Sequence, residues 1–479
     1  MSRLAGLLRE KPWAARLAGL AVLAMVAFGV ALSSLLSVAA GCASIAAALV
    51  VLVMGRSGVM SVRGIFSLTW FVFFPVRLIS ISVDRDSVRY YQSVRGASHR
   101  DLIWIWLLTT AAFVAFVVGA VLIERWRPPV PRVDEEAFSY SDFLALCIIG
   151  TFLYAALDLG GIASGILGTV ATISLFGIAG ASYCEIKRLT THRYLSAIFV
   201  VINSGLGYRA GFKEALLLPI AAWIVGRFVG GQRLRARYVV LAVLTVCIGF
   251  AAIQGLRVGR VASESDTNPI SATLRGLTKY SLTDGERHSY QGVEIVGNVA
   301  NGILFRLKGV DYLMEIMDAV PDRVSYQYGR SLWQPALSVV PGSSDLFSLD
   351  PDYRQLSLGR FVTTRLIFES SQTDNRSSQS MTFPGDLYLN FGSVGIILGM
   401  GLLGVAFGAF DVLFRVSGPM TTGILVMAGL PLVAVERNLA YVIVTSVIAL
   451  GVIAVTVVVI PRGRALVTRG RERAARRSA

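Results

Sequence analysis

Long apolar runs joined by short polar links dominate this chain, and one long polar stretch interrupts them late in the sequence. Runs of this length and composition predict membrane-spanning helices. We place the spans at 17–33, 35–54, 64–82, 103–123, 143–157, 162–182, 195–207, 213–230, 238–256, 388–412, 420–435 and 439–460. Because a helix satisfies its own backbone hydrogen bonds inside lipid, the pattern predicts an all-α integral membrane protein with about twelve transmembrane helices.

The polar stretch divides the chain into four expected parts. A first membrane bundle of about nine spans occupies 1–256, and a large loop or cap follows at 257–386. The last three spans lie at 387–460, and a basic tail lies at 461–479. Within the loop, apolar residues recur at helical spacing over 301–320, so we expect the loop to be partly helical.

Composition and charge support a membrane protein and predict its orientation. The mean hydropathy is +0.64 and 54% of residues are hydrophobic, as is typical of integral membrane proteins. With the N-terminus inside, the inner segments carry 24 Lys and Arg against 9 Asp and Glu, and the rest carries 21 of each. The net charge of +15 then lies wholly inside, which is the positive-inside pattern. We therefore expect both termini in the cytoplasm and the large loop outside it.

The individual residue types narrow the class further. Seven Arg and one Glu in the tail are typical of a topology anchor on the anionic lipid bilayer, so we expect no nucleic-acid partner. Arg outnumbers Lys 40 to 5, which suggests a GC-rich genome and hence a bacterial cytoplasmic (inner) membrane. The four cysteines lie in or at the ends of spans, and this placement predicts neither a disulfide framework nor a metal site.

The sharpest candidate for chemistry is the pair Arg209 and Lys213, which follows a glycine-rich segment at the outer end of a span. The two residues are four positions apart, so we expect them to share a helix face. A cation in this place needs water, an acid or a ligand anion. One interpretation is a clamp for a diphosphate, which Arg binds in a bidentate manner. The other is an interfacial snorkelling pair with Glu214 as a neutralising neighbour.

Other basic residues would extend the same outer surface, although each alone also fits a structural role. They are Arg257, Arg260, Arg306, Lys308 and Arg437. Taken together, these cations predict an anionic ligand at the outer face of the membrane.

The loop enters the next span through 385–392, Gly-Asp-Leu-Tyr-Leu-Asn-Phe-Gly. In a helix, Asp386 and Asn390 lie one turn apart. The Asp386 carboxylate is a candidate general base, or a partner for one of the Arg residues. The alternative is structural, since a carboxylate suits the positive end of a helix and Pro384 with Gly385 marks a helix start.

Layout and three local patterns resemble the Wzy-type family, the O-antigen and exopolysaccharide repeat-unit polymerases. The shared layout is about twelve spans, both termini inside and a large outer loop late in the chain. The local patterns are Gly207-Tyr208-Arg209-Ala210 opening a span, 301–311 with Arg306 followed by Tyr328-Gly329 and Pro341, and the 385–392 entry into the next span. One departure is that Gly-Ser-Ser-Asp follows Pro341, where family members often carry a basic residue.

The resemblance implies a glycosyltransferase of polysaccharide biosynthesis in the cell envelope. A glycan on a polyprenyl diphosphate, such as undecaprenyl diphosphate, would be transferred onto another lipid-linked oligosaccharide repeat unit. A chain-length regulator and a flippase are the partners that it implies. No nucleotide-binding loop, zinc motif or serine-hydrolase motif occurs in a fitting context, so we expect no cofactor, metal or nucleotide.

The resemblance also implies roles for single residues. Arg209 and Lys213 would hold the diphosphate, and Asp386 would be the candidate base. The remaining residues expected to bind substrate are Arg257, Arg260, Arg306, Lys308, Arg437, Tyr388 and Asn390.

Three other functions stay open at this point. An O-antigen ligase or another lipid-linked-sugar glycosyltransferase shares the outer loop and the basic face; Asp84 and Asp86 have the acid-x-acid form of some metal-dependent members. A polysaccharide transporter or flippase would place charges deep within spans, where Arg77 is the main example. A non-catalytic assembly component would tolerate loss of Arg209. The sugar and its linkage are not encoded in any of these patterns.

Overall fold

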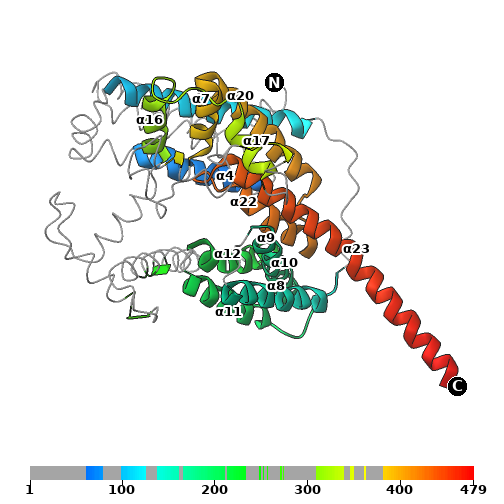
Figure 1. The fold of residues 1–479 in the computed structure, drawn as a ribbon. Coiled ribbons are helices and arrows are strands. Elements are labelled where there is room, and N and C mark those ends of the chain that lie inside the picture. Colours follow the sequence, from blue (N-terminus) through cyan, green and yellow to red (C-terminus); the bar gives the residue numbers. More distant parts are fainter. Residues whose placement is uncertain are drawn as a thin grey trace. The chain divides into compact units, whose positions relative to one another are not determined.

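The computed structural model describes residues 61–78, 99–125, 138–160, 165–210, 213–232, 309–338, 346–349, 361–362 and 381–478, with the single residues 248, 249, 252, 256, 270, 271 and 273. Within these ranges, the side chains at 99–102, 124–125, 158–160, 165–167, 210, 213–214 and 460–478 are not described. Every regular element in this part of the chain is a helix (Figure 1). The expected all-α class is therefore confirmed for the described residues.

Five helical stretches of the described residues are long and apolar enough to cross a membrane. They are Ile103–Ile123, Tyr140–Leu157, Gly168–Ile186, Phe383–Leu413 and Leu439–Val459. Shorter apolar stretches are Val62–Val76, Ala215–Val229 and Pro419–Leu432. The chain is thus a multi-pass membrane protein. The total of about twelve spans stays a prediction, because 17–33, 35–54 and nearly all of 238–256 lie outside the described residues.

The chain falls into two compact units, which we describe one at a time. Unit 1 comprises Met1–Val130, Leu307–Leu413 and Leu432–Val444. Unit 2 comprises Pro131–Arg306, Phe414–Pro431 and Thr445–Ala479. The large loop from Leu307 onward therefore belongs to the same unit as the span that follows it.

Unit 1 is organised around one long helix pair. Its elements are α4 (Val62–Phe71), the π-helical turn η1 (Val72–Val76), α7 (His99–Arg125), α16 (Gly309–Ala319), α17 (Arg330–Leu337), α20 (Phe383–Leu413) and the beginning of α23 (Leu439–Ser478). α20 lies against α7 over much of its length. A Cβ on Gly404 would be 2.0 Å from the carbonyl oxygen of Phe116, and one on Gly119 would be 2.1 Å from that of Gly401. These glycines bring the backbones together, which is how helices gain packing contacts in lipid.

Aromatic side chains fill the space between α4 and this pair. The ring of Phe66 in α4 lies 4.4 Å from that of Phe116 in α7 and 5.2 Å from that of Phe407 in α20, centroid to centroid. All three side chains are buried. Near the end of α20, the Asp411 carboxylate accepts a 2.8 Å hydrogen bond from the backbone N–H of Val62. A carboxylate of one helix thereby stabilises the positive end of another.

Unit 2 is built around α10 (Ile173–Ile186), whose residues are almost all buried. α10 packs against α8 (Tyr140–Gly160), α11 (Leu195–Ala210), α12 (Lys213–Val229) and α21 (Pro419–Ile424). The short α9 (Gly165–Ala171) precedes α10, and η5 (Leu425–Gly429) with α22 (Leu430–Leu432) follows α21. A Cβ on Gly226 of α12 would lie 2.3 Å from the carbonyl oxygen of Ala179, so small residues again set the helix spacing.

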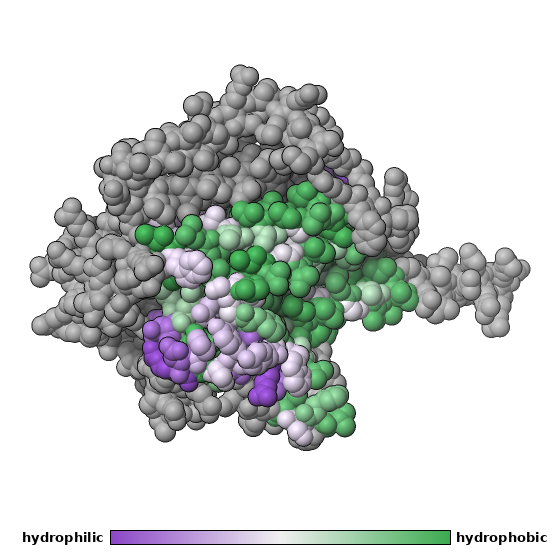
Figure 2. Space-filling model, turned by 90° about the horizontal axis from the view of Figure 1, so that it is seen from above, coloured by the Kyte–Doolittle hydropathy of each residue, from purple (hydrophilic) through white to green (hydrophobic). Residues whose placement is uncertain are grey.

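Apolar side chains remain exposed along single helix faces. In α7 they are Trp104, Leu107, Val114, Val118 and Leu122, whose spacing keeps them on one side of the helix. Figure 2 shows apolar side chains gathered over a broad area of the described surface. Soluble proteins rarely expose so large an apolar area, whereas a surface in contact with lipid requires it.

Candidate functional site

Several of the predicted site residues meet where the large loop contacts the start of α20. We call this place the loop junction and define it as residues 325–333, 381–392 and 433–441. α20 begins at Phe383, five residues before the span expected at 388–412, with Pro384 in its first turn. The N–H of Gly385 donates to Oγ1 of Thr382 at 3.3 Å, which caps the helix start. The expected helix start at Pro384 and Gly385 is confirmed.

Asp386 is the centre of the loop junction and is 0% exposed. Its Oδ1 accepts hydrogen bonds from the Ser331 hydroxyl at 2.6 Å and from Nδ2 of Asn390 at 3.4 Å. Its Oδ2 accepts one from the backbone N–H of Leu439 at 3.0 Å. One carboxyl group therefore joins the loop, α20 and the start of α23. Removing it would leave buried donors without a partner, which is more costly than an average hydrogen bond is favourable.

Asn390 completes this network one helical turn later. Its Nδ2 donates to the backbone carbonyl of Asp386 and to Oγ of Ser331, both at 2.7 Å. Its Oδ1 accepts from the backbone N–H of Gly329 at 2.7 Å. The predicted one-turn relationship between Asp386 and Asn390 is confirmed, and both side chains are turned to the loop.

A break in α20 gives the loop two further hydrogen bonds. Gly392 has φ 68° and ψ −161°, which interrupts the helical backbone. The carbonyl of Leu389 then accepts from the N–H of Gln327 at 3.0 Å, and the carbonyl of Asn390 accepts from the N–H of Tyr328 at 3.3 Å. In an unbroken helix these carbonyls bind amides of the following turn. The Gly392 break therefore exposes backbone acceptors that the loop uses.

Tyrosines surround the break. The ring of Tyr326 lies 6.3 Å from that of Tyr388 and 6.4 Å from that of Tyr328, centroid to centroid. A Cβ on Gly392 would be 3.2 Å from the hydroxyl oxygen of Tyr326, so glycine also leaves room for this ring. Tyr388, which we expected to bind substrate, is buried beneath the loop.

The link before α23 forms the third side of the loop junction. Oδ1 of Asn438 accepts from the backbone N–H of Met381 at 2.7 Å, and the carbonyl of Val435 accepts from the N–H of Phe383 at 3.2 Å. Between these residues, the Arg437 guanidinium lies 4.6 Å above the ring of Tyr441. Of the predicted basic residues, Arg437 is thus placed at the loop junction.

The chemistry available at this junction is primarily that of an anchor. Asp386 has no solvent-exposed surface, and both of its oxygens accept hydrogen bonds. A general base must reach the proton that it removes. The role of Asp386 as a base stays a prediction, and it requires the junction to open.

Arg209 and Lys213 lie at the turn between two helices of unit 2. α11 ends at Ala210 and α12 begins at Lys213, so the expected shared helix face is wrong. α11 and α12 form a helix hairpin, because they pack closely against each other. A Cβ on Gly207 would be 2.3 Å from the carbonyl carbon of Ala215. The segment that we expected to open a span, 207–210, instead closes α11. The backbone positions still put both cations at the same end of this helix hairpin.

The other predicted site residues lie either in unit 2 or outside the described part of the chain. Arg209 is exposed and belongs to unit 2, and Asp386 belongs to unit 1. The side chain of Lys213 is not described. The residues that lie outside the described part of the chain are Arg257, Arg260, Arg306, Lys308, Asp84 and Asp86.

The charge expected inside a span, Arg77, has a partner in the loop. Its Nε and Nη2 donate to the two carboxylate oxygens of Asp311 at 2.9 and 2.8 Å. Asp311 lies in α16, the described part of the helix expected at 301–320, and α16 packs against η1 and α20. A bidentate ion pair explains how a cation is tolerated here. The sequence showed each charge but gave no sign that they meet.

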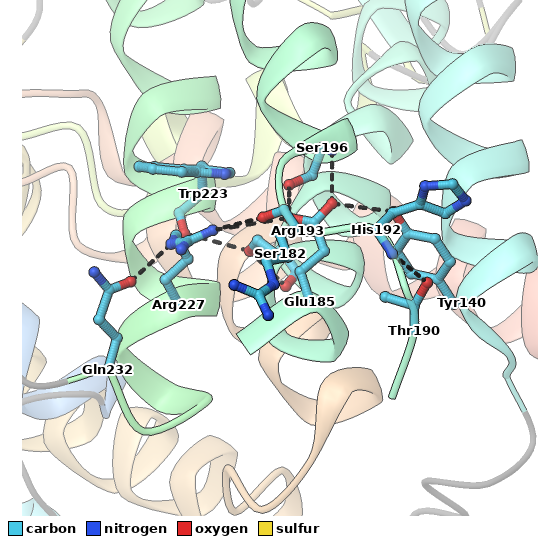
Figure 3. A network of polar contacts seen from close by, with 11 residues as sticks. Tyr140, Ser182, Glu185, Thr190, His192, Arg193, Ser196, Trp223, Arg227 and Gln232 are labelled. Carbon is cyan, nitrogen blue, oxygen red and sulfur yellow. Dashed lines mark hydrogen bonds and ion pairs between the residues drawn. The ribbon is translucent and has the colours of Figure 1, made fainter. Parts of the chain in front are cut away.

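A second polar network, in unit 2, was not anticipated from the sequence (Figure 3). Glu185 of α10 accepts hydrogen bonds from the backbone N–H and the hydroxyl of Ser196 at 2.8 and 2.7 Å, and from the Tyr140 hydroxyl at 3.0 Å. Nη1 of Arg227 lies 3.8 Å from Oε2 of Glu185, the oxygen that also accepts from the Ser196 hydroxyl. In the sequence, the available sign of this network was that Glu185 and Arg227 are charged residues close to the ends of the spans expected at 162–182 and 213–230.

Arg227 is held on every side by neighbours from unit 2. Its Nε donates to Oε1 of Gln232 at 2.7 Å, and its Nη1 donates to the carbonyl of Arg193 at 3.3 Å. Its guanidinium lies 4.6 Å from the Trp223 ring and 5.1 Å from the Tyr194 ring. Stacking and ion pairing together satisfy a nearly buried cation. This network joins α8, α10, α11 and α12, and its closed set of partners indicates a structural role.

Comparison with known proteins adds no assignment to this geometry. No protein-family model, curated protein or solved structure matches the chain. Among the described residues, no group of three His, Cys, Asp or Glu side chains is arranged to hold a metal ion. Cys147 and Cys184 are buried free thiols.

Proposed function

We propose that this protein is a membrane glycosyltransferase that polymerises polyprenyl-diphosphate-linked oligosaccharide repeat units. The proposed site faces the outer side of a bacterial cytoplasmic membrane, with both termini in the cytoplasm and the large loop outside. This orientation follows from the distribution of Lys and Arg along the chain. The lipid substrate would reach the protein from within the bilayer, alongside a flippase and a chain-length regulator.

One observation carries the proposal: two sequence patterns that resemble the polymerases contact each other. Gly329 and Asn390 are 61 positions apart, yet the N–H of Gly329 donates to the Asn390 side chain at 2.7 Å. Ser331, two residues beyond Gly329, donates to Asp386 of the second pattern. Separate fragments of chance similarity would have no reason to meet, whereas parts of one site would. The contact supports a loop held in a defined position on the spans.

The reaction requires charge stabilisation more than a cofactor. The bond between the anomeric carbon of the growing glycan and its diphosphate breaks, and the diphosphate leaves with the bonding electron pair. A hydroxyl of the acceptor sugar forms the new glycosidic bond and gives its proton to a base. Cations placed near the leaving oxygens lower the barrier by stabilising the developing negative charge.

The basic residues are proposed to provide this stabilisation. Arg209 in the last turn of α11 and Lys213 at the start of α12 place two cations at one end of a hairpin. The start of α12 also favours an anion, because the first N–H groups of any helix have no acceptor within that helix. The proposed helpers are Arg257, Arg260, Arg306, Lys308 and Arg437.

For the buried residues of the loop junction we propose a positioning role instead of charge stabilisation. Asp386, Asn390 and Tyr388 lie under the loop and hold its shape, so we propose that they position the loop for substrate. If Asp386 also acts as the base, the loop has to move to admit the acceptor hydroxyl. Positioning is itself a large contributor to rate, because it makes the encounter of two substrates intramolecular.

The test is the length of the surface polysaccharide on a gel. Cells lacking the gene would be complemented with wild type, Arg209→Ala or the control Arg323→Ala, whose exposed cation pairs with Asp318. We expect single repeat units in the deletion, a full ladder with wild type and Arg323→Ala, and no ladder with Arg209→Ala at matched expression.

Other outcomes would contradict the proposal. A normal ladder in the deletion would exclude the polymerase function, and loss of even the single capped unit would indicate a ligase or flippase. A chelator that abolishes polymerisation in washed membranes would favour the metal-dependent alternative with Asp84 and Asp86. An unchanged ladder with Arg209→Ala would fit a non-catalytic assembly component.

A further inference from the structure

The loop junction presents an aromatic side chain in an unusual backbone conformation. Tyr328 has φ 47° and is 76% exposed, and Gly329 follows with φ 90°. Residues other than glycine rarely adopt positive φ, and an aromatic residue does so less readily than Asn or Asp. Burial of the Tyr328 ring does not stabilise this turn. The conformation is instead fixed by the hydrogen bonds from Tyr328 and Gly329 to Asn390.

Two further rings accompany Tyr328. A Cβ on Gly329 would lie 3.7 Å from Cζ of Phe391 in α20 and 3.9 Å from Cδ1 of Trp333 in α17. Phe391 is 48% exposed and Trp333 is 44% exposed. We call Tyr328, Trp333 and Phe391 the aromatic patch. Its rings come from a turn and two helices, so the hydrogen bonds of the loop junction fix their arrangement.

Charged and polar residues are close to the aromatic patch along the chain. Asp322 and Ser325 precede Tyr328, Arg330 follows it at the start of α17, and all three residues are exposed. Apolar rings beside exposed charges suit a ligand that has both apolar faces and many hydroxyl groups. The faces of a sugar ring carry C–H groups with slight positive charge, which the negative face of an aromatic ring attracts. The hydroxyls at the edge of the sugar can bind water and nearby polar groups.

We propose that the aromatic patch binds the oligosaccharide of the lipid-linked substrate by stacking sugar rings on Tyr328 and Trp333. The inference rests on the proposed function and names the glycan subsite of that function. It also explains the strained turn, since strain that persists in a fold tends to occur at ligand sites. Anchoring at the membrane interface would need aromatic residues but no fixed geometry and no strained backbone.

The test is saturation-transfer NMR on the full-length protein in nanodiscs. The probe is the oligosaccharide released by mild acid from the lipid-linked repeat units of the same cells. We expect transfer to the sugar-ring protons of the probe with wild type. With Tyr328→Ala or Trp333→Ala we expect an affinity about tenfold lower, which corresponds to about 1.4 kcal/mol of binding free energy. Phe347→Ala is the control, because Phe347 is a 52% exposed aromatic residue of the same loop outside the patch.

Each result separates the aromatic patch from the polymerase function. Unchanged affinity in Tyr328→Ala and Trp333→Ala, with thermal stability like wild type, would overturn the glycan site. Unchanged affinity with stability lost only in nanodiscs would identify an interfacial anchor and would equally overturn it. A normal ladder in deletion cells would contradict the polymerase function, while binding that depends on the patch would still establish the glycan site.

Discussion

Ser331 donates a 2.6 Å hydrogen bond to Asp386 across 55 positions of sequence, and both side chains are fully buried. The bond fastens the large loop to the first turn of a membrane-spanning helix. Because the backbone N–H of Leu439 binds the other oxygen of the same carboxylate, the start of α23 is fastened there as well. The described part of the loop, from Gly309 onward, is therefore attached to the same unit as the span that follows it.

Substitution of Asp386 separates a positioning role from a catalytic one. Asp386→Ala leaves two buried donors, the Ser331 hydroxyl and the Leu439 N–H, without their acceptor, so we expect a loss of about 3 kcal/mol or more in the free energy of unfolding. Asp386→Asn keeps an acceptor oxygen and the side-chain shape, so we expect a smaller loss and a ladder that is still visible. Thermal unfolding in detergent and the polysaccharide gel measure the two effects. An Asn variant that is as stable as wild type but makes no polymer would show that the carboxylate is the base.

The helix break at Gly392 predicts an unusual sensitivity to the smallest substitution. Its φ of 68° with ψ of −161° is accessible essentially to glycine alone, and a Cβ would also be 3.2 Å from the Tyr326 hydroxyl. We expect Gly392→Ala to lower the free energy of unfolding by about 1–3 kcal/mol and to loosen the loop. Limited proteolysis of the loop and thermal unfolding would detect both changes. Gly451→Ala in α23, where a Cβ meets no atom within 4 Å, is the control and should be neutral.

We expect Arg77 and Asp311 to stabilise the fold only when both charges are present. Each single substitution leaves a nearly buried charge without its partner, so we expect Arg77→Ala or Asp311→Ala to cost about 3–5 kcal/mol of stability. The double variant removes both charges and should be clearly more stable than either single one. A thermal-unfolding double-mutant cycle measures this coupling. The exposed pair Arg323 and Asp318 is the matched control, and exposed ion pairs contribute about 1 kcal/mol or less. Additive losses at Arg77 and Asp311 would contradict the pairing.

Much of the helical framework was predictable from the sequence, because a helix depends mainly on the length of an apolar run and on the Pro and Gly residues at its ends. The span expected at 103–123 coincides with the apolar part of α7, and Pro384 with Gly385 marks the start of α20. The helix hairpin of Arg209 and Lys213 was not predicted, because we expected both residues on one helix. Four-residue spacing describes one continuous helix, and the chain reverses between these two residues.

The side-chain contacts between distant residues that form the candidate site were harder to predict from the sequence. Asp386 was recognised as a special residue, but its partner Ser331 lies in the loop, and no local pattern links the two. The same holds for Arg77 with Asp311. The left-handed backbone of Tyr328 is imposed by Asn390, 62 positions later, so composition around Tyr328 gives no hint of it. Tertiary hydrogen bonds can override the local backbone preference of a residue, and the spacing of apolar residues does not reveal them.

Glu185 in unit 2 offers a test of whether a buried polar network is only structural. Glu185→Ala would leave the Ser196 donors unpaired and would remove the carboxylate facing Arg227, so we expect marked destabilisation. Glu185→Gln keeps an acceptor for Ser196 and should be less affected. Because the network has no assigned part in the reaction, polymer made per molecule of folded protein should stay near the wild-type value in both variants. That ratio comes from the polysaccharide gel and a quantitative blot of the same membranes. A stable Glu185→Gln protein without polymer would instead show that this network takes part in function.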